Sequence, residues 1–195
     1  MRPRRAIALT VLVVAGIAAA ARPFRHQRQY PLRFGFGRAA AADAIRKADT
    51  DVRPDGHGLP RDSGTVTAGE VVYRQRCAAC HGATGVEGPF YKLVGRMPGD
   101  SFNFARDPEL LPLRTIGSYW PYATTLYDYV NRAMPFDSPG SLKPREVYSV
   151  VAYLLNRNGI ISANAVMNEH TLPAVVMPSR NKFVPDNRRG GREIR

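Results

Sequence analysis

The spacing of apolar residues is most regular near residues 144–159. Five apolar residues recur there at intervals of three and four positions, which places them on one face of a helix. They are Val147, Val150, Val151, Leu154 and Leu155. Pro144 suits the first turn of this helix and Gly159 its C-terminal end. The pattern predicts an amphipathic helix that closes the folded part of the chain.

Two further helices are predicted from shorter patterns. The first begins at Thr67, which with Glu70 forms the T-x-x-E pattern of a capping box, and it runs to the cysteines that follow. The second covers residues 126–133 and ends at Met134, because Pro135 disfavours helical backbone for the residue before it. Residues 39–48 could add a short helix.

The segments between and around these helices lack periodicity and are rich in glycine and proline. Residues 22–64 are interpreted as an extended arm or linker, and residues 65–160 as one folded domain. Residues 161–195, with Pro173 and Pro178, are interpreted as an extended basic C-terminal arm. Residues 82–120 form an irregular stretch inside the domain.

The N-terminus has the pattern of an export signal. Three arginines within residues 2–5 precede an uncharged, largely apolar run at residues 6–21 that ends in alanines. Such a run is slightly short of the ~20 residues that span a bilayer, so a cleaved signal peptide is favoured over a retained, tilted anchor. A buried core helix is disfavoured, since Arg22, Arg25 and Arg28 follow at once. The expected location is the periplasm.

The formal net charge of +12 is confined to the two ends of the chain. Residues 1–53 and 180–195 carry the excess, whereas residues 54–179 hold eleven charges of each sign. This division argues against a nucleic-acid-binding domain. The basic ends could lie on a partner protein or an anionic membrane, or they could be solvated tails.

The strongest chemical signal is C-x-x-C-H at Cys77, Cys80 and His81, the pattern that attaches a c-type haem through two thioethers and binds its iron through the imidazole. The chain has only these two cysteines, and its other histidines are scattered singly, so a zinc site is poorly supported. A thioredoxin-like dithiol would require flanking strands, which the sequence does not predict. One covalent haem c is therefore the expected cofactor.

An electron carrier needs a sixth iron ligand, and a soft methionine thioether favours ferrous iron. Met134 is favoured because it follows a helix and precedes the closing one, so its loop could return to the far face of the haem. Met97 is the second candidate ligand, although core packing is the better interpretation for it, and an open or histidine-ligated iron is the last alternative.

The surroundings of the haem can be predicted less sharply. The second ring nitrogen of His81 needs an acceptor, which a carbonyl near Gly88 and Pro89 could supply. Trp120 and Tyr122, with Tyr119 and Tyr127, either line the haem or pack in the core. Pro89, Trp120 and Tyr122 are the candidate pocket residues, and no catalytic residue is predicted.

These features together resemble a class I cytochrome c, an all-α helical fold around one covalent haem, here with extended arms at both ends. Three strings resemble the SoxD-type cytochrome subunit of sulfur and sulfite dehydrogenases more specifically: residues 51–66, DVRPDGHGLPRDSGTV, residues 115–136, TIGSYWPYATTLYDYVNRAMPF, and residues 139–161, PGSLKPREVYSVVAYLLNRNGII. The resemblance covers roughly residues 30–185 and places Cys77, Cys80, His81 and Met134 on the haem positions of that family.

The resemblance implies an electron-transfer subunit. A SoxC-like molybdenum subunit would oxidise sulfite or carrier-bound sulfur, and this chain would pass the electrons to a downstream cytochrome c or oxidase. Better-known SoxD chains carry a second haem domain, so a monohaem partner of a sulfite dehydrogenase is equally compatible. The alternatives are a free-standing periplasmic carrier with disordered tails and, last, a catalytic haem with an open iron. A membrane contact is expected only through an uncleaved anchor at residues 6–21.

Overall fold

The computed structural model describes residues 34–104, 109 and 113–184. The chain divides into two compact units, residues 1–41 and 42–195. In the first unit, the rings of Phe34 and Phe36 stack with their centroids 6.5 Å apart. The predicted export segment lies outside the described residues, as do residues 185–195. Within the described part of the chain, no helix has both the length and the apolar character needed to cross a bilayer.

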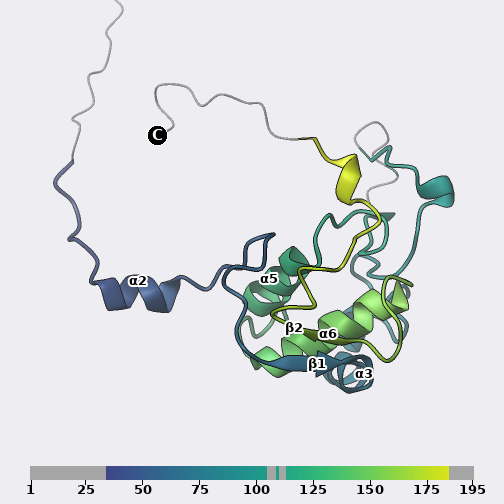
Figure 1. Cartoon of the computed structure of the whole chain (residues 1–195), viewed down its shortest axis with the longest axis horizontal. Coiled ribbons are helices and arrows are strands. Elements are labelled where there is room, and N and C mark those ends of the chain that lie inside the picture. Colours follow the sequence, from purple (N-terminus) through teal and green to yellow (C-terminus); the bar gives the residue numbers. More distant parts are fainter. Residues whose placement is uncertain (1–33, 105–108, 110–112, 185–195) are drawn as a thin grey trace, which may run out of the picture. The chain divides into compact units, whose positions relative to one another are not determined.

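The second unit is mainly helical, as the sequence predicts (Figure 1). Its regular elements, in chain order, are α2 (Ala42–Ala48), β1 (Ser63–Thr65), α3 (Val66–Arg76), α4 (Ala78–His81), α5 (Ala123–Ala133), α6 (Pro144–Arg157) and β2 (Val166–Asn168). Short 3-10 turns at Pro98–Asp100 and Arg180–Lys182 complete the set. The two strands pair antiparallel, with Gly64 opposite Met167.

Helix α6 forms the centre of the core and confirms the closing helix predicted from the sequence. Its apolar face is almost fully buried, and it packs against α3, α5 and both strands. Pro144 occupies the first turn, where the Glu146 carboxylate accepts the backbone N–H of Lys143 at 2.7 Å. This bond replaces part of the capping that a serine or threonine at position 143 would provide. Gly159 follows the helix with a φ of 67°, the left-handed conformation that favours glycine.

Helix α3 begins at Val66, one residue before the predicted start, and its cap lies two residues before the predicted cap. Thr65 has extended backbone and caps the helix by accepting the N–H of Ala68 at 3.2 Å, so the predicted cap at Thr67 is wrong. The reason is the pairing of β1 with β2, which was not predicted and which holds Thr65 at the end of a strand. The extended conformation of Thr65 turns its hydroxyl toward the free N–H groups of the first turn.

Helices α3 and α6 cross in direct backbone contact. Gly69 of α3 lies so close to α6 that a Cβ atom would overlap the carbonyl oxygen of Ser149. The crossing requires glycine at this position because there is no space for a side chain. The backbone conformation is not the reason, since the φ of Gly69 is in the ordinary helical region.

Helix α5 begins at Ala123, three residues before the predicted start, and ends at Ala133 as predicted. Met134 follows in an extended conformation, with φ −124° and ψ 148°, before Pro135. The proline thus ends the helix by the steric effect expected from the sequence.

Parts of both predicted arms pack on the helical core. From the N-terminal side, Val52 is buried and donates its N–H to Asp128 Oδ1 at 2.7 Å, while the Tyr148 hydroxyl donates to the Pro60 carbonyl at 2.9 Å. From the C-terminal side, three apolar side chains enter the same core. They are Met167, Leu172 and Met177. The boundaries of the folded domain at residues 65 and 160 stay a prediction.

We expect Gly69→Ala to destabilise the haem-loaded protein by about 3 kcal/mol, the upper range for overpacking, because its methyl group overlaps backbone that cannot move as a side chain would. Urea unfolding would measure the effect. Glu70→Ala, an exposed neighbour on the same helix, is the matched control and should change stability by less than about 0.5 kcal/mol. Equal stabilities for the two variants would contradict the contact.

The carboxylate of Asp128 provides a pH-dependent contact. Burial raises its pKa, but hydrogen bonds from Arg132 and from the Val52 N–H outweigh burial, and the net pKa lies below its usual value. The ionised form therefore stabilises the fold above the unfolded-state pKa, and this contribution is lost as the pH falls through the folded-state pKa.

We expect Asp128→Asn to cost about 1 kcal/mol of unfolding free energy at pH 7. The difference from wild type should shrink as the pH falls below about 4. Denaturant titrations at several pH values would test this, with the exposed Asp137→Asn as control. A pH-independent difference would refute the role assigned to the charge.

Candidate haem site

The two cysteines and His81 lie on one short helical turn directly after α3. Cys77 leaves the helical conformation, with φ −124° and ψ −34°, and separates α3 from α4. The N–H groups of Cys80 and His81 both donate to the Cys77 carbonyl, at 3.1 and 3.0 Å. Gly82 then ends the turn at a φ of 82°. The motif therefore presents its three candidate ligands from one compact backbone loop.

The two thiols have different surroundings. Cys77 is half-buried against the core, and this burial raises the pKa of its thiol to about 11. Cys80 is exposed. Free thiols are needed for two thioether bonds, and both cysteines are free.

The imidazole of His81 is held by a backbone carbonyl. Its Nδ1 lies 3.1 Å from the carbonyl oxygen of Tyr91, two residues beyond the Pro89 region in which the acceptor was expected. This contact assigns the proton to Nδ1, because a carbonyl can only accept. The Nε2 atom is then the nitrogen with a lone pair to bind iron.

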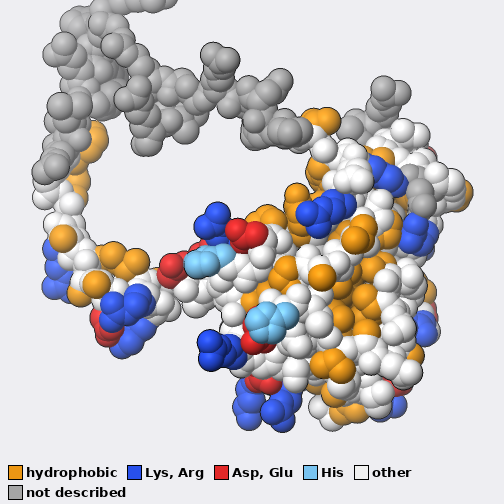
Figure 2. All heavy atoms as spheres, in the orientation of Figure 1, with side chains coloured by type: hydrophobic (Ala, Val, Ile, Leu, Met, Phe, Trp, Pro, Cys, Tyr) orange, Lys and Arg blue, Asp and Glu red, His pale blue; other side chains and the backbone are white. Residues whose placement is uncertain are grey.

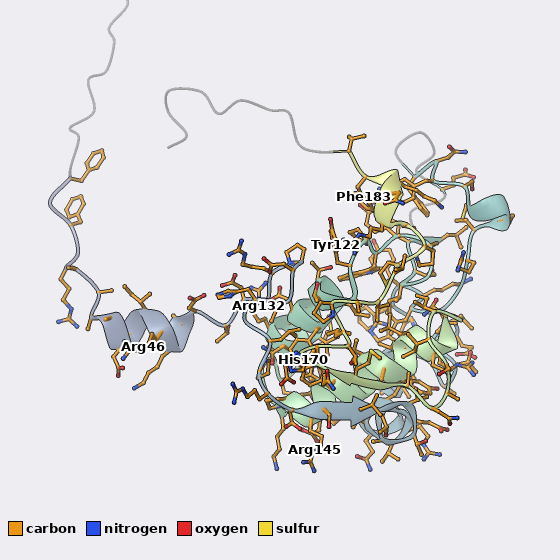
Figure 3. All side chains as sticks on the ribbon, in the orientation of Figure 1. Arg46, Tyr122, Arg132, Arg145, His170 and Phe183 are labelled. Atoms are coloured by element: carbon orange, nitrogen blue, oxygen red, sulfur yellow. The ribbon has the colours of Figure 1, made fainter. Side chains whose placement is uncertain are left out.

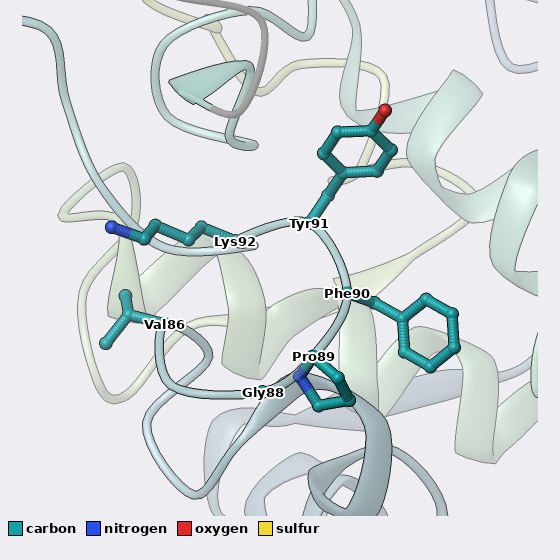
Figure 4. A pocket seen from close by; sticks show the side chains of 6 residues that line it. All are labelled: Val86, Gly88, Pro89, Phe90, Tyr91 and Lys92. Carbon is teal, nitrogen blue, oxygen red and sulfur yellow. The ribbon is translucent and has the colours of Figure 1, made fainter.

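The loop that carries Tyr91 lies directly against the motif. The Phe90 N–H donates to the Cys80 carbonyl at 3.4 Å. A Cβ atom on Gly88 would lie 2.5 Å from the carbonyl carbon of His81, so only glycine fits there. Pro89 and its neighbours line an open hollow of about 330 Å³ (Figure 4). This hollow is lined by Val86, Gly88, Pro89, Phe90, Tyr91 and Lys92, and by none of the predicted ligands.

Met134 is the predicted ligand on the opposite face. It is half-buried and packs against the same core cluster as Cys77. The alternative, Met97, is buried at 9% exposure in the irregular stretch, as expected of a packing residue. Met167 and Met177 are buried in the core. Their burial agrees with the gap-filling role that methionine commonly has.

The aromatic residues predicted near the haem separate into different environments. Tyr127 is fully buried and packs on Tyr148, with ring centroids 4.6 Å apart, so the core interpretation is correct for it. Trp120 packs against the core and lies 5.7 Å from the ring of Tyr129. The ring of Tyr122 has the Arg180 guanidinium 5.0 Å above it and lies near the C-terminal turn (Figure 3). A haem contact of Trp120, Tyr122 or Pro89 stays a prediction.

Two features of this region were not found from the sequence. One is the carbonyl of Tyr91, since a backbone acceptor leaves no residue-type signal. The other is a cluster of four aromatic rings, each in contact with at least two of the others, together with Arg114. The rings are those of Phe102, Phe104, Tyr119 and Phe183. The guanidinium of Arg114 lies 4.8 Å from the Tyr119 ring. Phe183 comes from the C-terminal segment, too far along the chain for a local pattern to predict its place.

The donor set fits a covalently bound haem. Two free thiols lie three residues apart on one short turn, and the imidazole beside them has its Nδ1 hydrogen-bonded and its Nε2 available as a ligand. Gly82 and Gly88 keep the backbone compact around these groups. A thioether at Met134 follows a helix packed on the same core. This is the ligand chemistry of a low-spin c-type haem.

Comparisons with known proteins agree with this chemistry. The family described as cytochrome c oxidase, cbb3-type, subunit III matches residues 64–154. Among solved structures, the sulfane dehydrogenase SoxCD from Paracoccus pantotrophus is 39% identical, with a TM-score of 0.66. The match covers 80% of this chain and 73% of that chain. A comparison with curated proteins finds no match.

The helical fold and the haem motif define a class I c-type cytochrome with one covalently attached haem c. The chain belongs to the SoxD-like cytochrome subunits. As a member of this family, it is a haem c electron-transfer subunit.

We expect Met134→Leu to abolish the low-spin signature of the ferric haem, because leucine fills space but cannot bind iron. Loss of the soft ligand should also lower the reduced-to-oxidised ratio at a fixed potential by about tenfold or more, ~59 mV for a one-electron couple. Visible spectra and a redox titration would measure both. Met97→Leu is the matched control and should keep the wild-type spectrum. The reverse result would identify Met97 as the ligand.

Proposed function

We propose that this cytochrome accepts electrons from a SoxC-like molybdenum subunit that oxidises sulfite or sulfur compounds. It passes them to a downstream cytochrome c or oxidase in the periplasm. Residues 1–21 would direct export, either as a cleaved signal or as an anchor through residues 6–21. The observation that carries the proposal is the 39% identity to the sulfane dehydrogenase SoxCD across most of both chains.

In this proposal each residue of the site has a defined part. Cys77 and Cys80 would hold the haem by thioether bonds, and His81 and Met134 would bind its iron. The haem would supply one-electron redox chemistry. With both His81 and Met134 as iron ligands, no coordination position would remain for a substrate, so the residues of the site would suit electron relay. The Tyr91 carbonyl keeps the His81 ring in one orientation throughout.

The N-terminal segment supports docking to a partner. Helix α2 has no buried residue, and the apolar side chains of Phe34, Phe36 and Ile45 are 61%, 90% and 56% exposed. Arg46 and Lys47 add positive charge beside Ile45. Holding such a segment in one conformation costs entropy that a bound partner would offset. We propose that residues 34–48 bind the molybdenum subunit.

A free-standing periplasmic carrier is the second candidate. It is favoured by the burial of Met167, Leu172 and Met177, because much of the C-terminal segment packs on its own domain and needs no partner to cover it. The two candidates differ in whether the exposed N-terminal apolar side chains contribute to function. Figure 2 shows Lys and Arg side chains spread over one face of the domain, several of them near its edges. An electrostatic contact would suit either candidate.

The triple substitution of Phe34, Phe36 and Ile45 by alanine tests the proposal. Because all three side chains are exposed, the haem spectrum and the unfolding midpoint should stay at wild-type values. Co-purification of molybdenum and sulfite-driven haem reduction should fall by about tenfold or more, as expected when anchor residues of an interface are removed. Val176→Ala, at a side chain 75% exposed, is the control.

The chain should be purified from its native source with its natural partners present. A cytochrome that carries no molybdenum protein, and whose haem sulfite does not reduce in the presence of the host's soluble fraction, would contradict the proposal. That result would leave the free-standing carrier.

A further inference from the structure

Asn158 is a buried amide at the C-terminal end of α6, with 6% of its surface exposed. Its Oδ1 accepts the N–H groups of Gly95 and Gly117, both at 3.0 Å. Its Nδ2 donates to the carbonyls of Leu93 and Leu154, at 3.2 and 2.8 Å. Both donor hydrogens and both acceptor lone pairs of the amide are therefore used.

These four bonds join three parts of the molecule. Leu93 and Gly95 belong to the loop after the haem motif, Gly117 belongs to the segment before α5, and Leu154 lies in α6. The two loops also bond to each other. The Thr115 hydroxyl donates to the Gly95 carbonyl at 2.6 Å, and the Ile116 N–H donates to the Leu93 carbonyl at 3.1 Å.

Gly117 shows how tightly this junction is packed. A Cβ atom at that position would lie 2.6 Å from Asn158 Oδ1 and 2.6 Å from the Gly95 carbonyl oxygen. A side chain at position 117 would therefore displace either the Asn158 amide or the Gly95 backbone. The amide and the two loops that it joins are thus in close contact, with no side chain between them.

The same loop holds the proximal imidazole. The Leu93 N–H donates to the Gly85 carbonyl at 2.8 Å, which closes a loop with Tyr91 inside it. Tyr91 supplies the carbonyl that faces His81 Nδ1 at 3.1 Å. Leu93, two residues further on, is bonded on its carbonyl side to Asn158. A continuous path of backbone and one buried amide therefore connects α6 to the His81 ring.

We infer that Asn158 is a positioning residue for the proximal haem ligand: by fixing Leu93 and Gly95, it holds the Tyr91 carbonyl against His81 Nδ1. The inference rests on the proposed role of His81 as an axial ligand. A carbonyl held at this nitrogen makes the imidazole a stronger donor and favours ferric iron. Loosening the loop weakens that contact and favours ferrous iron.

The test compares Asn158→Ala with Asn156→Ala in the full, haem-loaded chain. Asn156 lies on the same helix end, and its Nδ2 donates to the Ile161 carbonyl at 2.9 Å, away from the His81 loop. Both variants should lower the unfolding midpoint. Only Asn158→Ala should raise the reduced-to-oxidised ratio at a fixed potential, by about threefold, and shift the low-spin electron paramagnetic resonance signals that report the imidazole ring.

A second pair of variants applies if Asn158→Ala does not yield folded holoprotein. Thr115→Val removes the other hydrogen bond to Gly95, whereas Thr115→Ser keeps the hydroxyl. Valine should shift the ratio in the same direction, and serine should restore the wild-type value.

Two results would overturn the inference. In the first, Asn158→Ala and Thr115→Val lower stability but leave the reduced-to-oxidised ratio and the resonance signals at the values of Asn156→Ala. In the second, they lower the reduced-to-oxidised ratio instead of raising it. Failure of the His81 assignment is recognised separately. In that case the wild-type spectrum itself would lack the signature of a histidine-ligated low-spin haem.

Discussion

The crossing of α3 and α6 sets the position of the candidate haem site. Gly69 brings the α3 backbone against Ser149 of α6 without an intervening side chain. Because α3 runs directly into Cys77, this contact fixes where the haem motif begins relative to α6. The C-terminal end of α6 holds the loop that faces His81, through the side chain of Asn158. Helix α6 therefore positions both the start of the haem motif and the loop that orients its imidazole.

The parts of the fold that could be predicted are those whose signal is local. The stripe on α6 repeats with helical spacing, and Pro135 fixes the residue at which α5 ends, so both were found from the sequence. The C-x-x-C-H pattern identified the cofactor because covalent haem attachment needs those residue types at that spacing. Each of these signals lies within a few residues of the feature that it predicts.

The remaining features depend on segments that are distant in the sequence. The cap of α3 is Thr65 and not Thr67 because β1 pairs with β2, about a hundred residues later in the chain. Strands of three residues show too little alternation of apolar and polar residues to be recognised in a sequence. The acceptor for His81 is a main-chain oxygen, which any residue at position 91 could supply. The burial of Met167, Leu172 and Met177 likewise depends on a surface that α6 and its neighbours create.

The residues that orient His81 and the residues proposed for docking belong to different parts of the chain. The surroundings of His81 are fixed from within by α6, Asn158 and the glycines that admit close backbone contact, and none of these groups belongs to residues 34–48. The exposed apolar side chains proposed for docking lie on the N-terminal segment, before the folded core begins. Under the two proposals made above, partner affinity depends on residues 34–48, whereas the reduction potential depends on the loop that Asn158 holds. The two properties would then be set by different parts of the chain.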